Sequence, residues 1–148
     1  MQIIERYDVF ARGAVSTSAT WAGAVSQVEA AIATVDWPHG SRSFSLNPTP
    51  ILNKKGKLTT HANGVVPIKE PMLRHLKKCG WVAESLPPAH PGEVLTKRDL
   101  DALLFADELY MGFEWETGNI SSSHRAMNKL TLALDRERIA GGFLVLPM

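Results

Sequence analysis

Residues 112–119, Gly-Phe-Glu-Trp-Glu-Thr-Gly-Asn, constrain the fold of this chain more than any other segment. Glu114 and Glu116 alternate with Phe113 and Trp115, so a strand here directs both carboxylates to one face and both rings to the other. A Gly-Asn pair and three serines follow, which is typical of a break and then a helix start. The pattern predicts a half-buried strand that leads two acids to the beginning of a helix.

This strand has a natural partner just before it in the chain. Residues 97–105 and 109–117 both have strand character, and the polar residues between them form a short turn. The simplest arrangement is an antiparallel hairpin centred between Asp107 and Glu108. Its register is specified because a slip of one residue would move every apolar side chain to the wrong face.

The predicted register brings four acids together. Asp101 lies opposite Glu114, and Asp99 lies opposite Glu116, so all four carboxylates share one face. The opposite face is expected to hold the apolar neighbours Leu100, Ala102, Phe113 and Trp115. A cation such as Mg²⁺ or Mn²⁺ would relieve the repulsion, and Mg²⁺ usually binds one or two carboxylates together with substrate phosphate. The alternative is a solvated acidic face screened by Arg98 and nearby lysines.

A helix predicted from about Ser122 to Arg138 favours the metal interpretation. Ser121, Ser122 or Ser123 can cap it, and its first turn offers unpaired N–H groups to an anion. Arg125 and Lys129 lie four residues apart on one face, where they can bind a phosphate or neutralise carboxylates. His124 is better explained as a phosphate contact or surface residue than as a base.

The remaining pattern predicts one α/β domain over residues 1–148. We expect strands over 2–10, 41–46, 81–86 and 139–146, helices over 16–35 and 69–79, and a long basic loop over 47–67. A loop of this length is uncommon in a compact domain, so it is either a mobile excursion or an arm that contacts a polyanion.

Composition narrows the class of protein. A net charge of +1 carries no argument for nucleic acid, so local lysine clusters must supply it. Cys79 is the single cysteine, which excludes an intramolecular disulfide and a cysteine-based zinc cluster. The N-terminus lacks the build of a signal peptide, and no apolar run approaches the ~20 residues of a membrane span. We therefore expect a soluble, cytoplasmic protein.

Together these motifs resemble a known family. An Asp, a hairpin and then Glu-x-Glu resembles the PD-(D/E)xK nucleases, in the variant whose usual Lys is replaced by Glu. The segment from Phe113 to Leu130 is similar to BglII/BamHI-type type II restriction endonucleases, with the closest similarity over residues 101–147 and fainter similarity at 64–69 and 80–81. The Asp…Glu-x-Glu pattern alone is common, but joined to Gly-Asn-x-x-Ser-x-x-Arg it is much more specific. The resemblance implies a restriction-endonuclease-like core, a mixed sheet flanked by helices.

The resemblance also implies roles for the acids and bases. Asp101 and Glu114 hold the metal ion, while Glu116 takes the place of the missing Lys and orients or deprotonates a water, or shares a second metal ion. Arg125 and Lys129 position the phosphate and stabilise its developing charge. The implied reaction is Mg²⁺-dependent hydrolysis of double-stranded DNA at a specific site, and a palindromic site implies a homodimer.

Several assignments stay open. Such sites often contain a further acid from a helix, for which Glu29 is the first choice and Glu70 the second, and Asp99 competes with Asp101 for the metal. Further DNA contacts are expected from Lys54, Lys55, Lys57, Lys69, Ser121, Ser122, Ser123 and His124.

The end of the chain leaves room for other functions. Enzymes of this type generally continue beyond the last predicted strand, so we expect a C-terminally shortened nuclease domain. One alternative is an inactive relative that binds DNA or a protein partner. The other is a hydrolase that uses paired carboxylates on another substrate, such as a glycoside.

Overall fold

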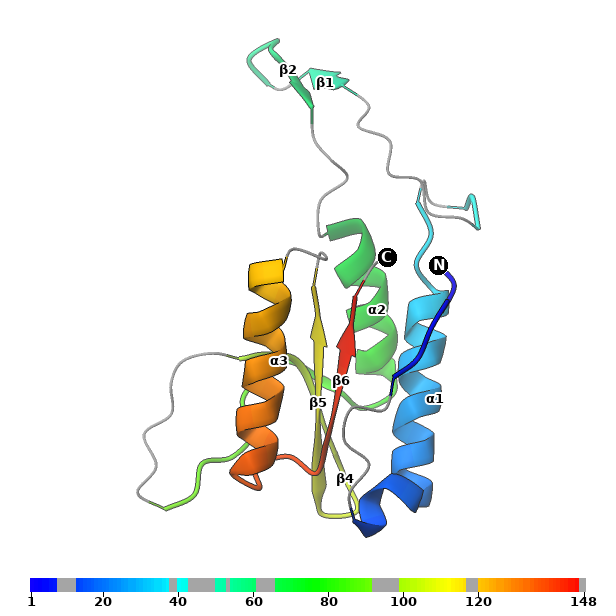
Figure 1. Ribbon diagram of the computed structural model, residues 1–148. Helices are drawn as coiled ribbons and strands as arrows, with labels where there is room; N and C mark the ends of the chain where they lie inside the picture. The colour runs from blue at the N-terminus through cyan, green and yellow to red at the C-terminus, as the bar shows by residue number, and fades with distance from the viewer. Residues whose placement is uncertain are drawn as a thin grey trace.

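In the computed structural model, helices cover both faces of a four-stranded sheet (Figure 1). The structure describes residues 1–7, 13–37, 40–42, 50–52, 54–60, 66–91, 99–116 and 120–146. Helices α1 (Ala19–Ala33) and α2 (Val66–Lys78) cover one face, and α3 (Ile120–Asp135) covers the other. This arrangement confirms the predicted mixed sheet flanked by helices. Among the described residues, no helix is long and apolar enough to span a bilayer.

The main sheet has the order β3-β4-β5-β6. Its strands are β3 (Val82–Ser85), β4 (Leu100–Ala106), β5 (Leu109–Trp115) and β6 (Gly141–Val145). The first three run antiparallel to their neighbours, whereas β6 runs parallel to β5, with α3 as the connection. A separate antiparallel hairpin pairs β1 (Pro50–Leu52) with β2 (Leu58–Thr60), and Figure 1 shows it standing away from the main sheet.

The β4–β5 hairpin has the predicted register. The pairs run from Ala102↔Phe113 to Ala106↔Leu109, which leaves Asp107 and Glu108 as a two-residue turn. Both turn residues have positive φ, 48° and 61°, as a type I′ turn requires. Extending this pairing by one residue brings Asp101 opposite Glu114.

Helix α1 is attached to the far edge of the sheet by aromatic contacts. Ser18 caps it by accepting a hydrogen bond from the Trp21 backbone N–H at 3.1 Å. The Trp21 ring stacks on Phe143 of β6, with ring centroids 4.6 Å apart. A Cβ on Gly141 would collide with the rigid Trp21 indole, so only glycine permits this approach. A short 3₁₀ turn, η1 (Ala14–Thr17), precedes the helix.

Three predicted elements differ from the structure. Residues 1–7 form no strand, and their Met1 amino group donates to the Val35 carbonyl at 2.6 Å just after α1; residues 8–10 lie outside the described part. Residues 41–42 are not a strand, and 43–46 also lie outside it. The predicted loop over 47–67 contains the β1–β2 hairpin, whose strands of three residues are too short to show alternation.

Both helices that flank the acids begin earlier than predicted. Helix α2 starts at Val66 rather than residue 69, with Pro67 in its first turn, where a missing N–H costs no hydrogen bond. Helix α3 starts at Ile120, so Ser121, Ser122 and Ser123 lie inside its first turn rather than at its cap. The first turns of these two helices lie at the same end of the molecule (Figure 1).

Candidate functional site

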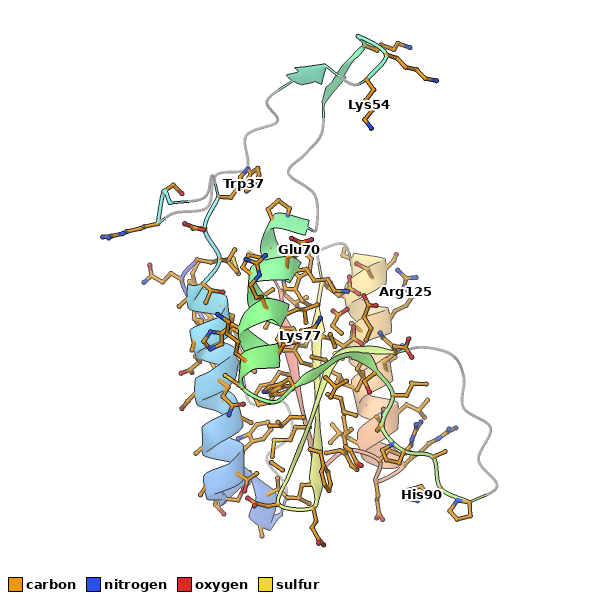
Figure 2. All side chains as sticks on the ribbon, turned by 180° about the vertical axis from the view of Figure 1, so that it is seen from behind. Trp37, Lys54, Glu70, Lys77, His90 and Arg125 are labelled. Atoms are coloured by element: carbon orange, nitrogen blue, oxygen red, sulfur yellow. The ribbon has the colours of Figure 1, made fainter. Side chains whose placement is uncertain are left out.

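The acids lie at the end of the β4–β5 hairpin opposite its turn, where β5 leads towards α3. Figure 2 shows Glu70 of α2 and Arg125 of α3 at this same end. Two helices therefore begin beside the carboxylates that the sheet presents. Each of these helices contributes one lysine to the acids.

Asp101 is held by both of its carboxylate oxygens. Its Oδ1 lies 2.7 Å from the Lys69 Nζ on α2, and its Oδ2 accepts a hydrogen bond from the Trp115 backbone N–H at 2.9 Å. Although partial burial alone would lower the pKa of Lys69, its hydrogen bond to Asp101 and the charges of Asp101, Glu84 and Glu114 raise it. Asp101 therefore connects β4, β5 and α2 in a fixed orientation.

Glu114 is the one strongly buried acid of the described residues. Its side chain is 3% exposed, and it forms an ion pair with Lys129 of α3, whose Nζ also donates to the Asp99 carbonyl at 3.0 Å. Burial, against the lowering effect of Lys129 and with a smaller contribution from the charges of Asp101 and Glu116, raises the pKa of Glu114 to about 7. A second positive charge near this carboxylate would be favourable.

The two acids are contacted from opposite faces of the sheet. Lys69 comes from α2, which packs on the face with Ala102 and Phe113, whereas Lys129 comes from α3 on the other face. The prediction that Leu100 shares a face with Ala102 is wrong, because Leu100 packs with Leu103 and Leu130 under α3. The carboxylates thus meet at the end of the sheet, between helices of both layers, rather than along one solvated face.

An irregular residue in β3 lies beside this break in alternation. Pairing with β4 passes from Ala83↔Ala102 to Ser85↔Leu100, and Glu84 between them has a φ of 50°. A left-handed conformation is uncommon for a residue with a side chain, and such residues concentrate at functional sites. The irregularity lies opposite Asp101, next to the point where Leu100 of β4 joins the cluster under α3 instead of the one that holds Ala102.

Glu84 joins the acids without having been predicted. Its Oε1 lies 3.9 Å from the Lys69 Nζ, and its side chain is 74% exposed. An isolated acid inside the predicted strand 81–86 was the available signal. Its proximity to Asp101 depends on the pairing of β3 with β4, which local periodicity does not reveal.

The other nominated acids have different surroundings. Glu116 is half-buried just after β5, and its backbone N–H donates to the Val145 carbonyl at 3.1 Å. Asp99 is exposed and contributes its carbonyl, rather than its carboxylate, to Lys129. Glu29 lies on α1, where its described ion pair is with Arg6 at 3.3 Å, and Glu70 is exposed on α2. The structure therefore brings Glu84, and not Glu29, to Asp101.

Apart from Lys69, which pairs with Asp101, the nominated DNA contacts fall into two groups. Lys54, Lys55 and Lys57 are exposed in the turn of the β1–β2 hairpin, and Figure 2 shows Lys54 at its tip. The α3 group lies in the first turns of that helix, with Ser121, His124 and Arg125 exposed and Ser122 and Ser123 half-buried. The second group is beside the acids, and the first extends outward from the same end of the molecule (Figure 1).

The carboxylate oxygens of this site suit a hard cation whose remaining ligands come from the substrate. Among the described residues, no group of three or more His, Cys, Asp or Glu side chains is close enough to enclose a metal by itself. Asp101 and Glu114 do present carboxylate oxygens within electrostatic reach of each other, and Glu114 is buried with one ammonium as its counter-charge. Two carboxylates completed by phosphate oxygens are a common arrangement for Mg²⁺.

Comparison with known proteins identifies relatives along the chain. The sequence model of the family described as "Restriction endonuclease BamHI" matches residues 1–148. The type II restriction enzyme OkrAI of Oceanobacter kriegii is 40% identical over 126 residues, covering 83% of this chain and 57% of that enzyme. The type II restriction enzyme BamHI of Bacillus amyloliquefaciens is 31% identical over 132 residues, covering 84% and 57%. The chain thus spans a little over half the length of these relatives.

Proposed function

Because this chain belongs to the BamHI restriction endonuclease family, we propose that it hydrolyses phosphodiester bonds of double-stranded DNA at a specific site, with Mg²⁺ or Mn²⁺ as cofactor. The observation that carries the proposal is the carboxylate pair Asp101 and Glu114, held by lysines from two different helices. These helices begin at the same end as the acids (Figure 1), where their N-termini favour a phosphate.

Four acids would surround the metal ion. Asp101 and Glu114 supply the principal ligands, with Glu116 beside them and Glu84 as the additional acid in place of Glu29. When bound, the ion would polarise the scissile phosphate and lower the pKa of a water molecule. Glu116 accepts a proton from the attacking water, because it is the less buried acid of the Glu-x-Glu pair.

The bases bind the phosphate. Lys129 is fixed beside Glu114 by its bond to the Asp99 carbonyl, so its charge is already in place when substrate arrives. Arg125, one turn before it on α3, is exposed and supplies a forked donor that matches two phosphate oxygens. Lys54, Lys55 and Lys57 would contact the DNA backbone further from the cleaved bond.

A homodimer would suit a palindromic site. Helix α3 exposes the large apolar side chains Ile120, Met127 and Leu132, which a second copy can cover. Light scattering after gel filtration, with and without a palindromic duplex, tests this assembly. A monomer under both conditions would contradict it.

Plasmid cleavage tests the activity. The protein is incubated with mixed-sequence plasmids and Mg²⁺, with Ca²⁺ in a parallel reaction, and compared with Glu114→Ala and with Glu108→Gln at the exposed turn. Discrete fragments from the wild type and Glu108→Gln, but not from Glu114→Ala, support the proposal. Tight DNA binding without cleavage would instead indicate an inactive relative, and no DNA affinity at low salt would refute both.

A further inference from the structure

The Lys69 ammonium lies beside Asp101, where the divalent cation would bind. The proposed function does not require a lysine at this position. We propose that, without DNA, the Lys69 ammonium occupies the cation position of Asp101, and that an arriving DNA phosphate draws it away so that the divalent cation can bind there. Cation binding and DNA binding are then coupled through this one side chain. The inference rests on the proposed function and adds a regulatory step to it.

The position of the ammonium is that of a bound cation. The Lys69 Nζ lies 2.7 Å from the Asp101 Oδ1 and 3.9 Å from the Glu84 Oε1, between two carboxylates of different strands. A divalent cation ligated by Asp101 would meet this charge at close range. The two cannot share the Oδ1 without strong repulsion, because they would be like charges at close range in a partly buried site.

The partners of the two lysines show which of them can leave. The Lys129 Nζ is bonded to a carboxylate and also to the Asp99 backbone carbonyl at 3.0 Å, an acceptor that no cation exchange removes. Among the described residues, Lys69 is held by carboxylates only. Lys129 therefore stays in place, and Lys69 is free to exchange one anion for another.

Asp101 is built to remain in place after Lys69 departs. Its Oδ2 accepts the Trp115 backbone N–H at 2.9 Å, which fixes the carboxylate independently of the lysine. A carboxylate oriented in advance loses little entropy when it binds a cation. The divalent cation can thus replace the Lys69 ammonium on Oδ1 while the Asp101 carboxylate keeps its orientation.

The route of the ammonium leads towards the phosphate site. Lys69 lies in the first turn of α2, at the end of the molecule where α3 also begins, and it is partly exposed beside the highly exposed Glu84. Its four-carbon stem lets the ammonium swing from Asp101 to a phosphate without moving the helix. Because coupling between two ligands is reciprocal, DNA raises cation affinity by the same factor as the cation raises DNA affinity.

Cation affinity measured with and without DNA tests the proposal. Tb³⁺ is the probe, because Trp115 lies next to Asp101 and can sensitise the luminescence of a Tb³⁺ ion bound there. Calorimetry with Ca²⁺ gives an independent value of the cation affinity. The duplex carries a non-hydrolysable linkage at the cleaved position. For the wild type we expect DNA to increase cation affinity about tenfold or more. We expect Lys69→Met to bind the cation about tenfold more tightly without DNA and to lose most of the increase.

Matched variants exclude a general effect of charge. Lys77→Met removes the same charge from an exposed position in the last turn of α2 (Figure 2) and should leave the coupling unchanged. Lys69→Arg keeps the charge, so the coupling should persist, with cation affinity without DNA equal to or below that of the wild type. This variant supplies the test if Lys69→Met fails to fold, as circular dichroism would show.

The outcomes separate the two proposals. Equal cation affinity of wild type and Lys69→Met without DNA, or stronger cation binding by Lys69→Arg, overturns the role of Lys69 while plasmid cleavage can still succeed. A wild type that binds neither Tb³⁺ nor Ca²⁺ even with DNA overturns the metal site of the proposed function as well.

Discussion

The two ends of the β4–β5 hairpin carry the same kind of residue in different surroundings. At the turn, Asp107 and Glu108 are exposed, and Asp107 accepts a hydrogen bond from the Thr20 hydroxyl of α1. At the open end, Asp101 and Glu114 are enclosed, and each is paired with a lysine. The two acids at each end of one hairpin therefore differ in their surroundings, because Lys69 of α2 and Lys129 of α3 pair with the acids of the open end. The groups that surround a carboxylate, more than its position in a strand, determine its chemical properties.

The largest expected difference between the two ends is in DNA cleavage. Glu114→Ala removes a proposed metal ligand, and we expect cleavage to fall by about 100-fold or more, whereas Glu108→Gln should change it less than about twofold. Single-turnover cleavage of a labelled duplex measures both. Comparable losses in the two variants would mean that the enclosed end is not the active site.

The pH dependence of stability should also separate the ends. Because the pKa of Glu114 is raised to about 7 in the folded protein, the folded state binds more protons than the unfolded state between about pH 4.5 and 7. The free energy of unfolding should therefore fall with rising pH across this window, by roughly 3 kcal/mol. Glu114→Gln should remove the fall, and Glu108→Gln should keep it. Urea unfolding in EDTA at several pH values measures this.

Removing the counter-charge sharpens the comparison. Lys129→Met leaves the ionised form of Glu114 buried without its ammonium, so we expect a loss of about 2 kcal/mol at pH 8 and much less at pH 5, where Glu114 is protonated. Thermal unfolding of wild type and variant at the two pH values gives the difference. A loss independent of pH would attribute the effect to the aliphatic stem of Lys129 rather than to its charge.

The smallest effect is expected at the turn. Thr20→Val removes the hydroxyl that bonds to Asp107, and an exposed hydrogen bond of this kind is worth about 0.5–1 kcal/mol. The free energy of unfolding should fall by that amount, with DNA affinity unchanged. Weaker DNA binding by Thr20→Val would show that the turn, too, contributes to the functional surface.

The predictability of the hairpin differs between its ends for a physical reason. Its register followed from the alternation around Phe113 and from the polar turn, both of which are local in sequence. The break in alternation at Leu100 lies beside the left-handed Glu84 of a neighbouring strand, and neither irregularity has a signal in the local sequence. Likewise, the pairing of Asp101 with Lys69 joins residues that only the tertiary fold brings together. Spacing could nominate the carboxylates, but it could not show which bases enclose them.

The stacking of Trp21 on Phe143 also affects the order in which the chain folds. The β4–β5 hairpin, α3 and β6 follow one another directly and can associate as soon as they are made, whereas α1 is synthesised first and meets its partner strand more than a hundred residues later. Closing so long a loop is entropically costly, so its docking comes late. During synthesis the Trp21 side of α1 therefore stays without its partner ring until β6 leaves the ribosome, which leaves this large aromatic side chain open to non-native contacts.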